Sequence, residues 1–325
     1  AICRARTVRS WAGAPTMTTR KRPRDATSSS APPSAVEVPP EQSGSAEHYD
    51  MDGPLLGAGA FGKVKLIKHR GTSSTFACKL MPKADVSMDD AVNEEVIMGA
   101  AGRHAHIISL VDAFELPGAW AIVTELATGG EVFDRICERG MFSEADAASV
   151  VRQVALALAH LHANKICHRD LKPENVLLAS PAPDAAVKLA DFGLAAFHEP
   201  PHVRMLEEVG TASYTAPEVF APPEVSLALG GGVAPGYDKA VDLWSLGCLT
   251  FTLLGGATPF DPDGHDDNVT IRQRVLDGEW GFDARAERWS HVSEHAKATI
   301  RSLLRADASA RPTASELLEA PWVRG

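Results

Sequence analysis

Residues 166–175 read Ile-Cys-His-Arg-Asp-Leu-Lys-Pro-Glu-Asn, and residues 187–193 read Val-Lys-Leu-Ala-Asp-Phe-Gly. Together the two stretches contain two carboxylates and one amide of interest, on Asp170, Asp191 and Asn175. These side chains offer oxygen ligands, which suit a hard cation such as Mg²⁺. Either carboxylate by itself would more simply be a loop acid or half of an ion pair, so its meaning depends on the sequence around it.

The sequence before these two motifs predicts a strand-rich unit. Residues 52–80 have the apolar runs and glycines of strands and turns, and residues 87–101 have a helical pattern. Two further apolar runs, at 107–114 and 120–126, are strand-like. This character ends near residue 127.

The sequence after Thr-Gly-Gly at 128–130 predicts a larger helical unit. Ser143 begins a capping-box-like pattern with an acid three residues later, and apolar residues follow at helical spacing. Further helical patterns cover residues 238–254, 266–277, 293–304 and 313–320.

A glycine-rich stretch lies near the start of the first unit. Residues 56–64 read Leu-Gly-Ala-Gly-Ala-Phe-Gly-Lys-Val, in which glycines let backbone N–H groups approach phosphate oxygens. A dinucleotide-binding motif would continue directly into a helix. Here residues 63–68 alternate as a strand does, which predicts a glycine-rich hairpin that covers a nucleotide. By itself this pattern would more often be an ordinary glycine turn.

Lys79 lies in the apolar run Phe-Ala-Cys-Lys at 76–79, where a charge is costly without an anionic partner. Phosphate oxygens and a carboxylate of the predicted helix would supply partners. Glu94 and Glu95 are the two candidates on that helix. We prefer Glu94, because apolar residues three, four and seven positions later share its face of the helix, whereas glycines lie four and seven positions after Glu95.

These motifs, in this order, resemble those of the eukaryotic protein kinases over about residues 49–323. The resemblance implies an α+β fold with two lobes. The N-lobe, at about 47–127, would be a small antiparallel β-sheet with one main helix, and the C-lobe, at about 128–325, would be larger and mostly helical. It also implies transfer of the γ-phosphate of ATP, with Mg²⁺, to protein Ser/Thr hydroxyls.

The same resemblance assigns roles to individual residues. Asp170 would accept or orient the proton of the substrate hydroxyl, Lys172 would lie near the γ-phosphate, and Lys79, held by Glu94, would bind the α- and β-phosphates. Asn175 and Asp191 would hold Mg²⁺. Further ATP contacts would come from backbone groups, from apolar walls and from Thr124 at the rear of the adenine pocket: Leu56, Gly57, Ala58, Gly59, Ala60, Phe61, Gly62, Val64, Ala77, Thr124, Glu125, Ala127 and Leu177.

Residues 125–134, 142–144 and 311–323 resemble the calcium/calmodulin-dependent kinase group, and residues 94–107 resemble its calcium-dependent plant and protist members. In that group the acids at the positions of Glu131 and Glu174 receive a basic residue upstream of the target hydroxyl. We therefore predict a preference for Arg-x-x-Ser/Thr, because arginine and carboxylates make strong charge-assisted contacts. The alternative is that both acids are solvated surface residues.

No EF-hand loop pattern occurs in the sequence, in contrast to the calcium-dependent members of the group. The chain ends at Gly325, directly after the last predicted helix, where a calmodulin-binding helix would follow. Direct calcium control is therefore not expected from these residues.

The segment between Asp191 and Gly210 contains no Ser, Thr or Tyr. In kinases of this type, the arginine before the catalytic aspartate, here Arg169, contacts a phosphate carried three residues before this glycine. That position holds Glu207, followed by Glu208. Our hypothesis is that Glu207 pairs with Arg169 in place of the phosphate, with one negative charge instead of nearly two. The alternative is that both glutamates are solvated.

Three further expectations follow from the resemblance. Glu218, in Ala-Pro-Glu at 216–218, would pair with Arg311, and Asp242 would hold the backbone of the catalytic loop. An Ala/Gly/Pro-rich insertion lies between Glu218 and Asp242, at about 222–236, and we interpret it as a surface loop.

Residues 1–46 differ in composition from the rest of the chain. They contain six prolines, and their seven basic residues all lie in the first 24 positions. This composition predicts disorder, since it lacks the large apolar residues of a core. The basic run at 20–24 is consistent with nuclear import, and the acid-free beginning with an organellar transit peptide; a plain solvated tail explains both as well. We expect a cytoplasmic or nuclear protein. The sequence begins with Ala1 and not with Met, which leaves two alternatives for the start of the protein: a start upstream of Ala1, or initiation at Met17.

Composition excludes several classes of protein. The 325 residues carry a formal net charge of −10, which does not favour binding to nucleic acid. No apolar run is long enough for a membrane span, and the five widely spaced cysteines fit neither a disulfide framework nor a CxxC metal site. We expect a monomer whose partners are protein substrates with basic residues upstream of Ser/Thr.

Two other functions remain as alternatives. A pseudokinase-like ATP-binding scaffold would lack the strand lysine, a catalytic carboxylate or the glycine-rich stretch, and none of these is missing. A small-molecule phosphotransferase of related fold is disfavoured by the Ala-Pro-Glu segment and by the extended helical C-terminal part.

Overall fold

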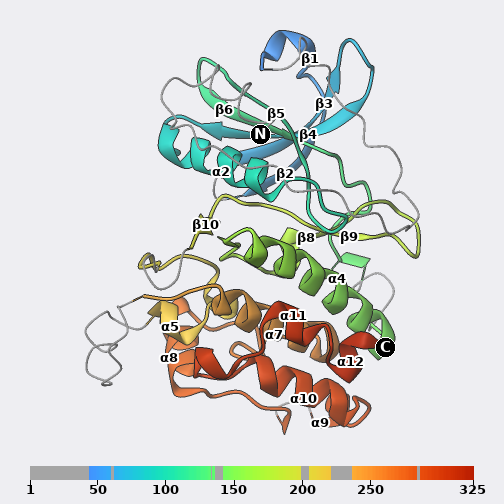
Figure 1. Ribbon diagram of the computed structural model, residues 1–325, viewed down its shortest axis with the longest axis vertical. Helices are drawn as coiled ribbons and strands as arrows, with labels where there is room; N and C mark the ends of the chain where they lie inside the picture. Colours follow the sequence, from blue (N-terminus) through green and yellow to red (C-terminus); the bar gives the residue numbers. More distant parts are fainter. Residues whose placement is uncertain are drawn as a thin grey trace, which may run out of the picture. The chain divides into compact units, whose positions relative to one another are not determined.

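The structure is a computed structural model that describes residues 44–59, 62–132, 134–135, 142–198, 205–220, 236–283 and 286–325. The chain divides into two compact units, Ala1–Ala127 and Thr128–Gly325 (Figure 1). The N-terminal segment predicted to be disordered lies almost entirely outside the described residues, as does the insertion at about 222–236.

The described part of the first unit is an antiparallel sheet with one main helix, as the kinase resemblance implied. The strands pair in the order β1-β3-β4-β6-β5, and β2 pairs with β3 outside this path. A short 3-10 helix, Ala46–His48, precedes them. The strands are β1 (Tyr49–Asp50), β2 (Leu55–Gly59), β3 (Gly62–His69), β4 (Thr75–Pro82), β5 (Leu110–Glu115) and β6 (Ala119–Thr124).

Apolar side chains on one face of this sheet form the core of the first unit. Ile67 of β3 and Phe76 and Cys78 of β4 pack with Tyr49 and Phe114, as strands with a two-residue period place alternate side chains on one face. Helix α2 (Met88–Ala101) begins where the Ser87 hydroxyl accepts the N–H of Asp90. Such a cap satisfies one of the N–H groups that a helix start leaves unpaired.

The second unit is mostly helical and contains two short antiparallel strand pairs, β7 with β10 and β8 with β9. Helix α7 is buried along almost its whole length, so it forms the centre of this unit. The described elements are α4 (Glu144–Ala163), β7 (Ile166–Cys167), η3 (Pro173–Asn175), β8 (Val176–Leu178), β9 (Val187–Leu189), β10 (Ala196–Phe197), η4 (Ala212–Tyr214), α5 (Pro217–Phe220), α7 (Ala240–Gly255), α8 (Asn268–Asp277), α9 (Ala286–Trp289), α10 (Glu294–Leu303), η6 (Ala308–Ala310), α11 (Ala314–Leu317) and α12 (Pro321–Arg324).

Two predicted elements differ from the structure by three residues at one end, whereas the other helices and single strands predicted with both bounds differ by at most two. The strand predicted from residue 107 begins only at Leu110, because the N–H of Ser109 donates to the side chain of Glu125 and not to a neighbouring strand. The helix predicted over 313–320 is the shorter α11, which is followed by the separate helix α12. Pro321 explains this break, since the residue before a proline is driven into an extended conformation.

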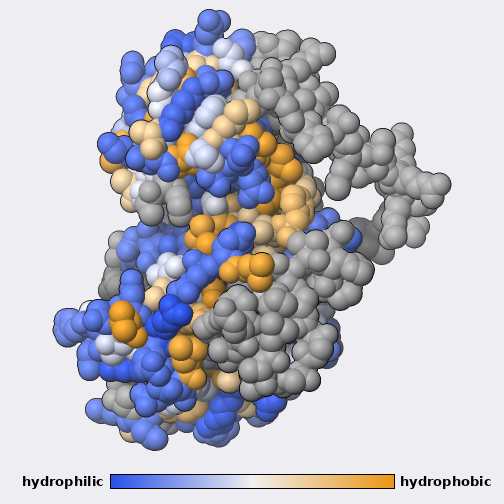
Figure 2. Space-filling model, turned by 90° about the vertical axis from the view of Figure 1, so that its left-hand side faces the viewer, coloured by the Kyte–Doolittle hydropathy of each residue, from blue (hydrophilic) through white to orange (hydrophobic). Residues whose placement is uncertain are grey.

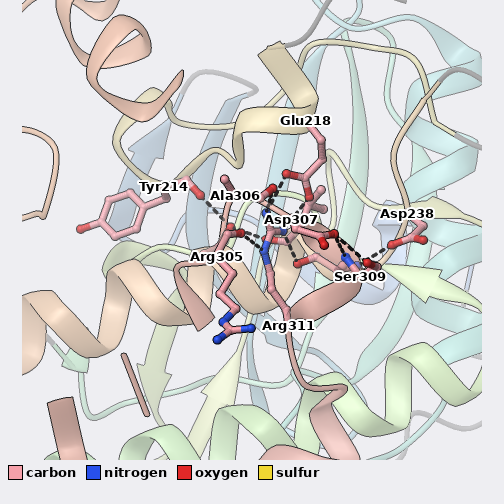
Figure 3. Close-up of polar contacts among 11 residues, drawn as sticks. Tyr214, Glu218, Asp238, Arg305, Ala306, Asp307, Ser309 and Arg311 are labelled. Atoms are coloured by element: carbon pink, nitrogen blue, oxygen red, sulfur yellow. Dashed lines mark hydrogen bonds and ion pairs between the residues drawn. The ribbon is translucent and has the colours of Figure 1, made fainter. Parts of the chain in front are cut away.

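The expected pair of Glu218 and Arg311 joins α5 to the C-terminal part of the second unit (Figure 3). The two Nη atoms of Arg311 lie 2.6 and 2.8 Å from the carboxylate oxygens of Glu218, and the Arg311 side chain is fully buried. Its guanidinium also lies 5.0 Å from the ring of Trp244 on α7. Removal of the Glu218 charge would leave the buried Arg311 guanidinium without its anionic partner, so this pair stabilises the second unit.

Hydrophilic residues predominate on the face of the molecule in Figure 2, and hydrophobic residues occur there in small groups. Among the described residues, no helix combines the length and the apolar composition that crossing a membrane requires.

Candidate active site

The glycine-rich stretch is a hairpin formed by β2 and β3. Gly57 pairs with Val64, and Gly59 pairs with Gly62. Gly62 has a φ of 143°, and a side chain there would collide with the carbonyl oxygen of Leu80 on β4, so the fold itself requires this glycine.

Gly57 and Gly59 have a different reason to be glycines, because a Cβ at either position would meet no atom of the described residues within 4 Å. The described residues therefore leave the space beside them open, as expected of a stretch whose backbone approaches a ligand. Leu56 and Ala58 lie on the same strand, whereas the predicted contacts Ala60 and Phe61 lie outside the described residues.

Lys79 on β4 pairs with Glu94 on α2. Its Nζ lies 2.9 Å from Oε1 and 3.0 Å from Oε2 of Glu94, and the Glu94 side chain is only 4% exposed. Val64 is the residue opposite Lys79 in the sheet, which places the lysine beside the glycine-rich hairpin. An ammonium fixed in this way is a suitable partner for phosphate oxygens.

Glu95, the other candidate, does not lie on the lysine side of the helix. It is 2% exposed, and its Oε1 has no hydrogen-bond partner among the described residues. Burial raises the pKa of Glu95 to about 8, and the charge of nearby Asp112 adds to this effect. Glu95 is therefore protonated at neutral pH, and Glu94 carries the negative charge that Lys79 needs.

The predicted walls of the adenine pocket in the first unit are on three neighbouring elements. Ala77 lies opposite Thr124 in the pairing of β4 with β6. Glu125 follows β6, and its carboxylate accepts the N–H of Ser109 at 2.8 Å while its own N–H donates to the Ser109 carbonyl. The Glu125 side chain is thus engaged in fixing the backbone that leads to Ala127, which is consistent with the predicted adenine contacts being made by backbone groups.

Asp170, Lys172 and Thr211 form a hydrogen-bonded triangle in the second unit. The Nζ of Lys172 lies 2.8 Å from Oδ2 of Asp170 and 3.0 Å from the Thr211 hydroxyl, which donates to Oδ1 of Asp170 at 3.0 Å. Asp170 is 7% exposed. A carboxylate that accepts a hydrogen bond from a hydroxyl at this distance has the geometry that a general base requires.

Asn175 and Asp191 are the expected Mg²⁺ ligands. Asn175 donates from Nδ2 to the carbonyl of Asp170 at 2.7 Å, which directs its amide oxygen away from that carbonyl, and its own carbonyl accepts the N–H of Ala190, the residue before Asp191. The described residues contain no cluster of three or more His, Cys, Asp or Glu side chains that would hold a metal ion alone. One amide and one carboxylate nevertheless fit Mg²⁺, which takes few protein ligands when phosphates supply others.

Asp242 on α7 holds the catalytic loop, as expected from the resemblance. It is fully buried and accepts the backbone N–H groups of His168 at 3.0 Å and Arg169 at 2.9 Å. His162 Nε2 lies 2.8 Å from the same carboxylate. Although burial raises the pKa of Asp242, these contacts outweigh it and lower the pKa to about 2. The charged group keeps Arg169 in a left-handed conformation, with a φ of 67°.

The side chain of Arg169 reaches the activation segment, which comprises residues 191–211. Its Nη1 lies 2.8 Å from Oε2 of Glu207, and the pKa of Glu207 is lowered by this hydrogen bond. Glu208 contacts a different arginine, Arg272 on α8, at 2.9 Å. The two glutamates therefore bind separate elements of the second unit.

Glu131 and Glu174 line a pocket of about 360 Å³ in the second unit, together with Tyr214, Asp261 and Asp263. Burial raises the pKa of Glu131, and the charges of Asp134 and Glu174 raise it further. Repulsion between the carboxylates would be relieved by a basic ligand. Leu177 on β8 bridges to Glu131, so this pocket is connected to the strand that follows the catalytic loop.

Three residues of these sites were not predicted from the sequence. Arg272 contacts Glu208 across 64 positions, and Tyr237 contacts Glu207 across 30. Asp261 lies in a loop that carries no recognisable motif. No local pattern marks such residues, because their partners are distant in sequence.

Comparison with known proteins agrees with this geometry. Residues 51–323 match the protein kinase domain family. The calcium/calmodulin-dependent protein kinase type I of Schizosaccharomyces pombe is 40% identical over 275 residues, which cover 83% of this chain and 77% of that protein. The calcium/calmodulin-dependent protein kinase type IV of Homo sapiens is 41% identical over 276 residues, 83% of this chain and 53% of that protein. Myosin light chain kinase A of Dictyostelium discoideum is 39% identical over 272 residues, 83% of this chain and 86% of that protein.

Proposed function

The chain belongs to the protein kinase family, as a Ser/Thr kinase of the calcium/calmodulin-dependent group, and on this premise we propose the details of its reaction. We propose that it uses ATP and Mg²⁺, that it prefers substrates with an arginine three residues before the target hydroxyl, and that it needs no phosphate in its activation segment. The chain spans about half the length of the human relative. Any statement about the activity of a whole protein of that length is therefore part of this proposal.

The hydrogen-bonded triangle of Asp170, Lys172 and Thr211 is the observation that carries the proposed reaction. Asp170 accepts the proton of the substrate hydroxyl, and Lys172 places a positive charge beside it. Lys79, fixed by Glu94, holds phosphate oxygens, while Asn175 and Asp191 are the oxygen ligands for the metal. When bound, Mg²⁺ would neutralise negative charge on the phosphates. Phosphoryl transfer depends more on this neutralisation than on covalent catalysis by the protein.

The acidic pocket supports the proposed substrate preference. Glu131 and Glu174 are close enough for their charges to oppose each other, and a guanidinium between them would replace repulsion by charge-assisted hydrogen bonds. Lysine would bind less well, because it lacks the planar set of donors that pairs with two carboxylates.

The contact between Glu207 and Arg169 supports the proposal that activation requires no phosphate. The segment from Asp191 to Gly210 offers no hydroxyl that could carry one. The names of the relatives make calcium with calmodulin the first regulator to test.

The experiment is γ-phosphate transfer by purified, phosphatase-treated chain to peptides that carry Arg, Lys or Ala three residues before Ser. We expect rapid transfer to the Arg peptide without calcium or calmodulin, and loss of the preference for Arg in Glu131→Gln and Glu174→Gln. Asp170→Asn is the inactive control. Equal rates on the Arg and Ala peptides would refute the substrate preference, and transfer only with calcium and calmodulin would refute independence of them.

A further inference from the structure

Tyr237 lies just before α7 and next to the activation segment. The residue is 2% exposed. Its backbone pairs with Met205 in an isolated antiparallel bridge, in which Met205 N donates to the Tyr237 carbonyl at 3.1 Å and Tyr237 N donates to the Met205 carbonyl at 3.0 Å. The main chain of Tyr237 is thus fixed to the activation segment two residues before Glu207.

The hydroxyl of Tyr237 has two hydrogen-bond partners, one on each side. Arg169 donates to it from Nη1 at 3.1 Å, and it donates to the carbonyl oxygen of Glu207 at 2.6 Å. The direction of both bonds is fixed, because a guanidinium only donates and a carbonyl only accepts. The hydroxyl therefore connects Arg169 to the main chain of Glu207.

This connection adds to the direct pair between Arg169 and the carboxylate of Glu207. The Glu207 side chain is 68% exposed, whereas that of Arg169 is 10% exposed. An ion pair with one largely exposed partner is weakened by salt. A phosphate would offer three oxygens and nearly two charges at the same place, but a carboxylate offers fewer bonds. The buried Tyr237 hydroxyl supplies a second attachment, to the main-chain carbonyl of Glu207, which does not move when the Glu207 side chain changes its rotamer.

The attached segment leads directly to the catalytic residues. Arg169 precedes Asp170, and Glu207 lies four residues before Thr211, which donates to Asp170. Nε of Arg169 also donates to the Leu194 carbonyl at 2.6 Å, so this one side chain holds the beginning and the end of the described activation segment. Displacement of Glu207 would release the segment that carries Thr211.

We propose that Tyr237 is a positioning residue of this kinase, whose hydroxyl joins Arg169 to the main chain of Glu207 and completes a lock on the activation segment that needs no phosphate. The proposal rests on the function proposed above, since the lock is useful only to an active kinase. The role of Tyr237 is indirect: it positions Thr211 and Asp170 and does not itself contact substrate or ATP.

The test uses Tyr237→Phe in the full chain, which removes the hydroxyl and keeps the ring. We expect kcat at saturating peptide to fall about tenfold, the loss of one well-placed positioning contact, with little change in KM for ATP. Tyr49→Phe is the matched control: Tyr49 is 1% exposed and donates to Asp112 at 2.9 Å, within the core of the first unit. This control is expected to lower stability and leave kcat unchanged.

Two further measurements separate a lock from a loss of stability. Raising the salt concentration from about 0.05 to about 0.5 M shortens the screening length severalfold. In Tyr237→Phe the Arg169 side chain is joined to Glu207 by the exposed ion pair alone, so kcat of this variant is expected to fall more with salt than kcat of the wild type. In hydrogen exchange, amides of residues 205–211 are expected to exchange faster in Tyr237→Phe and at the wild-type rate in Tyr49→Phe.

Combination of Tyr237→Phe with Glu207→Ala gives a double-mutant cycle. We expect the double variant to be about as slow as the slower single variant, since either change opens the same lock. Wild-type kcat and unchanged exchange in Tyr237→Phe would overturn the lock, and so would independent, multiplicative effects. A wild-type chain that transfers no phosphate would instead refute the proposed function, and the exchange rates would still decide whether the lock exists.

Discussion

The dipeptide Glu-Glu occurs twice in this chain, at 94–95 in helix α2 and at 207–208 in the activation segment. In α2 both side chains are buried, and within the described part of the chain only Glu94 has a positive partner, Lys79. In the activation segment both side chains are largely exposed, and each contacts its own arginine. The same two residues thus provide one charged and one neutral carboxylate in the first unit, and two charged contacts in the second.

The contrast teaches that surroundings decide what a glutamate does. Neighbours in a helix point about 100° apart, so Glu94 meets the lysine while Glu95 enters a buried site near Asp112. Solvent around Glu207 makes ionisation easy, and Arg169 lowers its pKa further. The cost of burying a charge without a partner is what separates Glu95 from the other three.

The largest effect is expected for Glu94→Gln, because an amide cannot neutralise Lys79. We expect kcat/KM for peptide phosphorylation to fall about 100-fold, as is usual when a phosphate-positioning group loses its orientation. Steady-state kinetics and ATP binding measure this loss. Activity within about threefold of the wild type would remove Glu94 from the proposed site.

Glu95→Leu is expected to stabilise the protein, and to do so more as the pH rises. With a folded pKa of about 8 and an ordinary value of 4.5, the unfolded state loses the Glu95 proton first, so wild-type stability falls between these two pH values. The leucine variant lacks this loss. From about pH 5 to about pH 6.5, its advantage in the free energy of unfolding should grow by about 2 kcal/mol.

Urea unfolding at the two pH values measures this difference. The change with pH is the quantity of interest, because the leucine also alters packing by an amount that does not depend on pH. An advantage that stays constant or shrinks as the pH rises would show that Glu95 ionises normally in the folded protein.

Glu207→Ala is expected to lower kcat about tenfold, because the activation segment loses its charged contact with Arg169. Since the pKa of Glu207 is lowered in the folded protein, the contact is present above the ordinary glutamate pKa and is lost as the pH falls through the lowered value. Rates of phosphatase-treated protein at saturating peptide measure the effect. An unchanged kcat would mean that Glu207 does not replace a phosphate.

Glu208→Ala is the matched control in the same segment and should have the smallest effect, about twofold or less in kcat. Its contact with Arg272 joins side chains that are 50% and 39% exposed, and it does not involve the catalytic loop. Salt should abolish even this difference. If kcat of Glu208→Ala fell as much as kcat of Glu207→Ala, the contact between Glu208 and Arg272 would be as important for ordering the activation segment as the contact between Glu207 and Arg169.

Much of the fold and of the site follows from short stretches of sequence. The glycine-rich hairpin, Lys79, Asp170, Asn175 and Asp191 lie in contiguous motifs, and the preference for Glu94 came from the period of one helix. Helix starts at Ser87 and Ser143 were predictable because a cap and its helix are neighbours in the chain.

Only the tertiary structure decided which distant groups meet. Arg272 reaches Glu208, Tyr237 connects Arg169 to Glu207, and Glu95 keeps its proton near Asp112. Each of these outcomes depends on burial and on contacts between segments far apart in sequence. Local propensities and motif spacing carry no information on such contacts, because the path of the chain between the partners is set by packing of the whole unit.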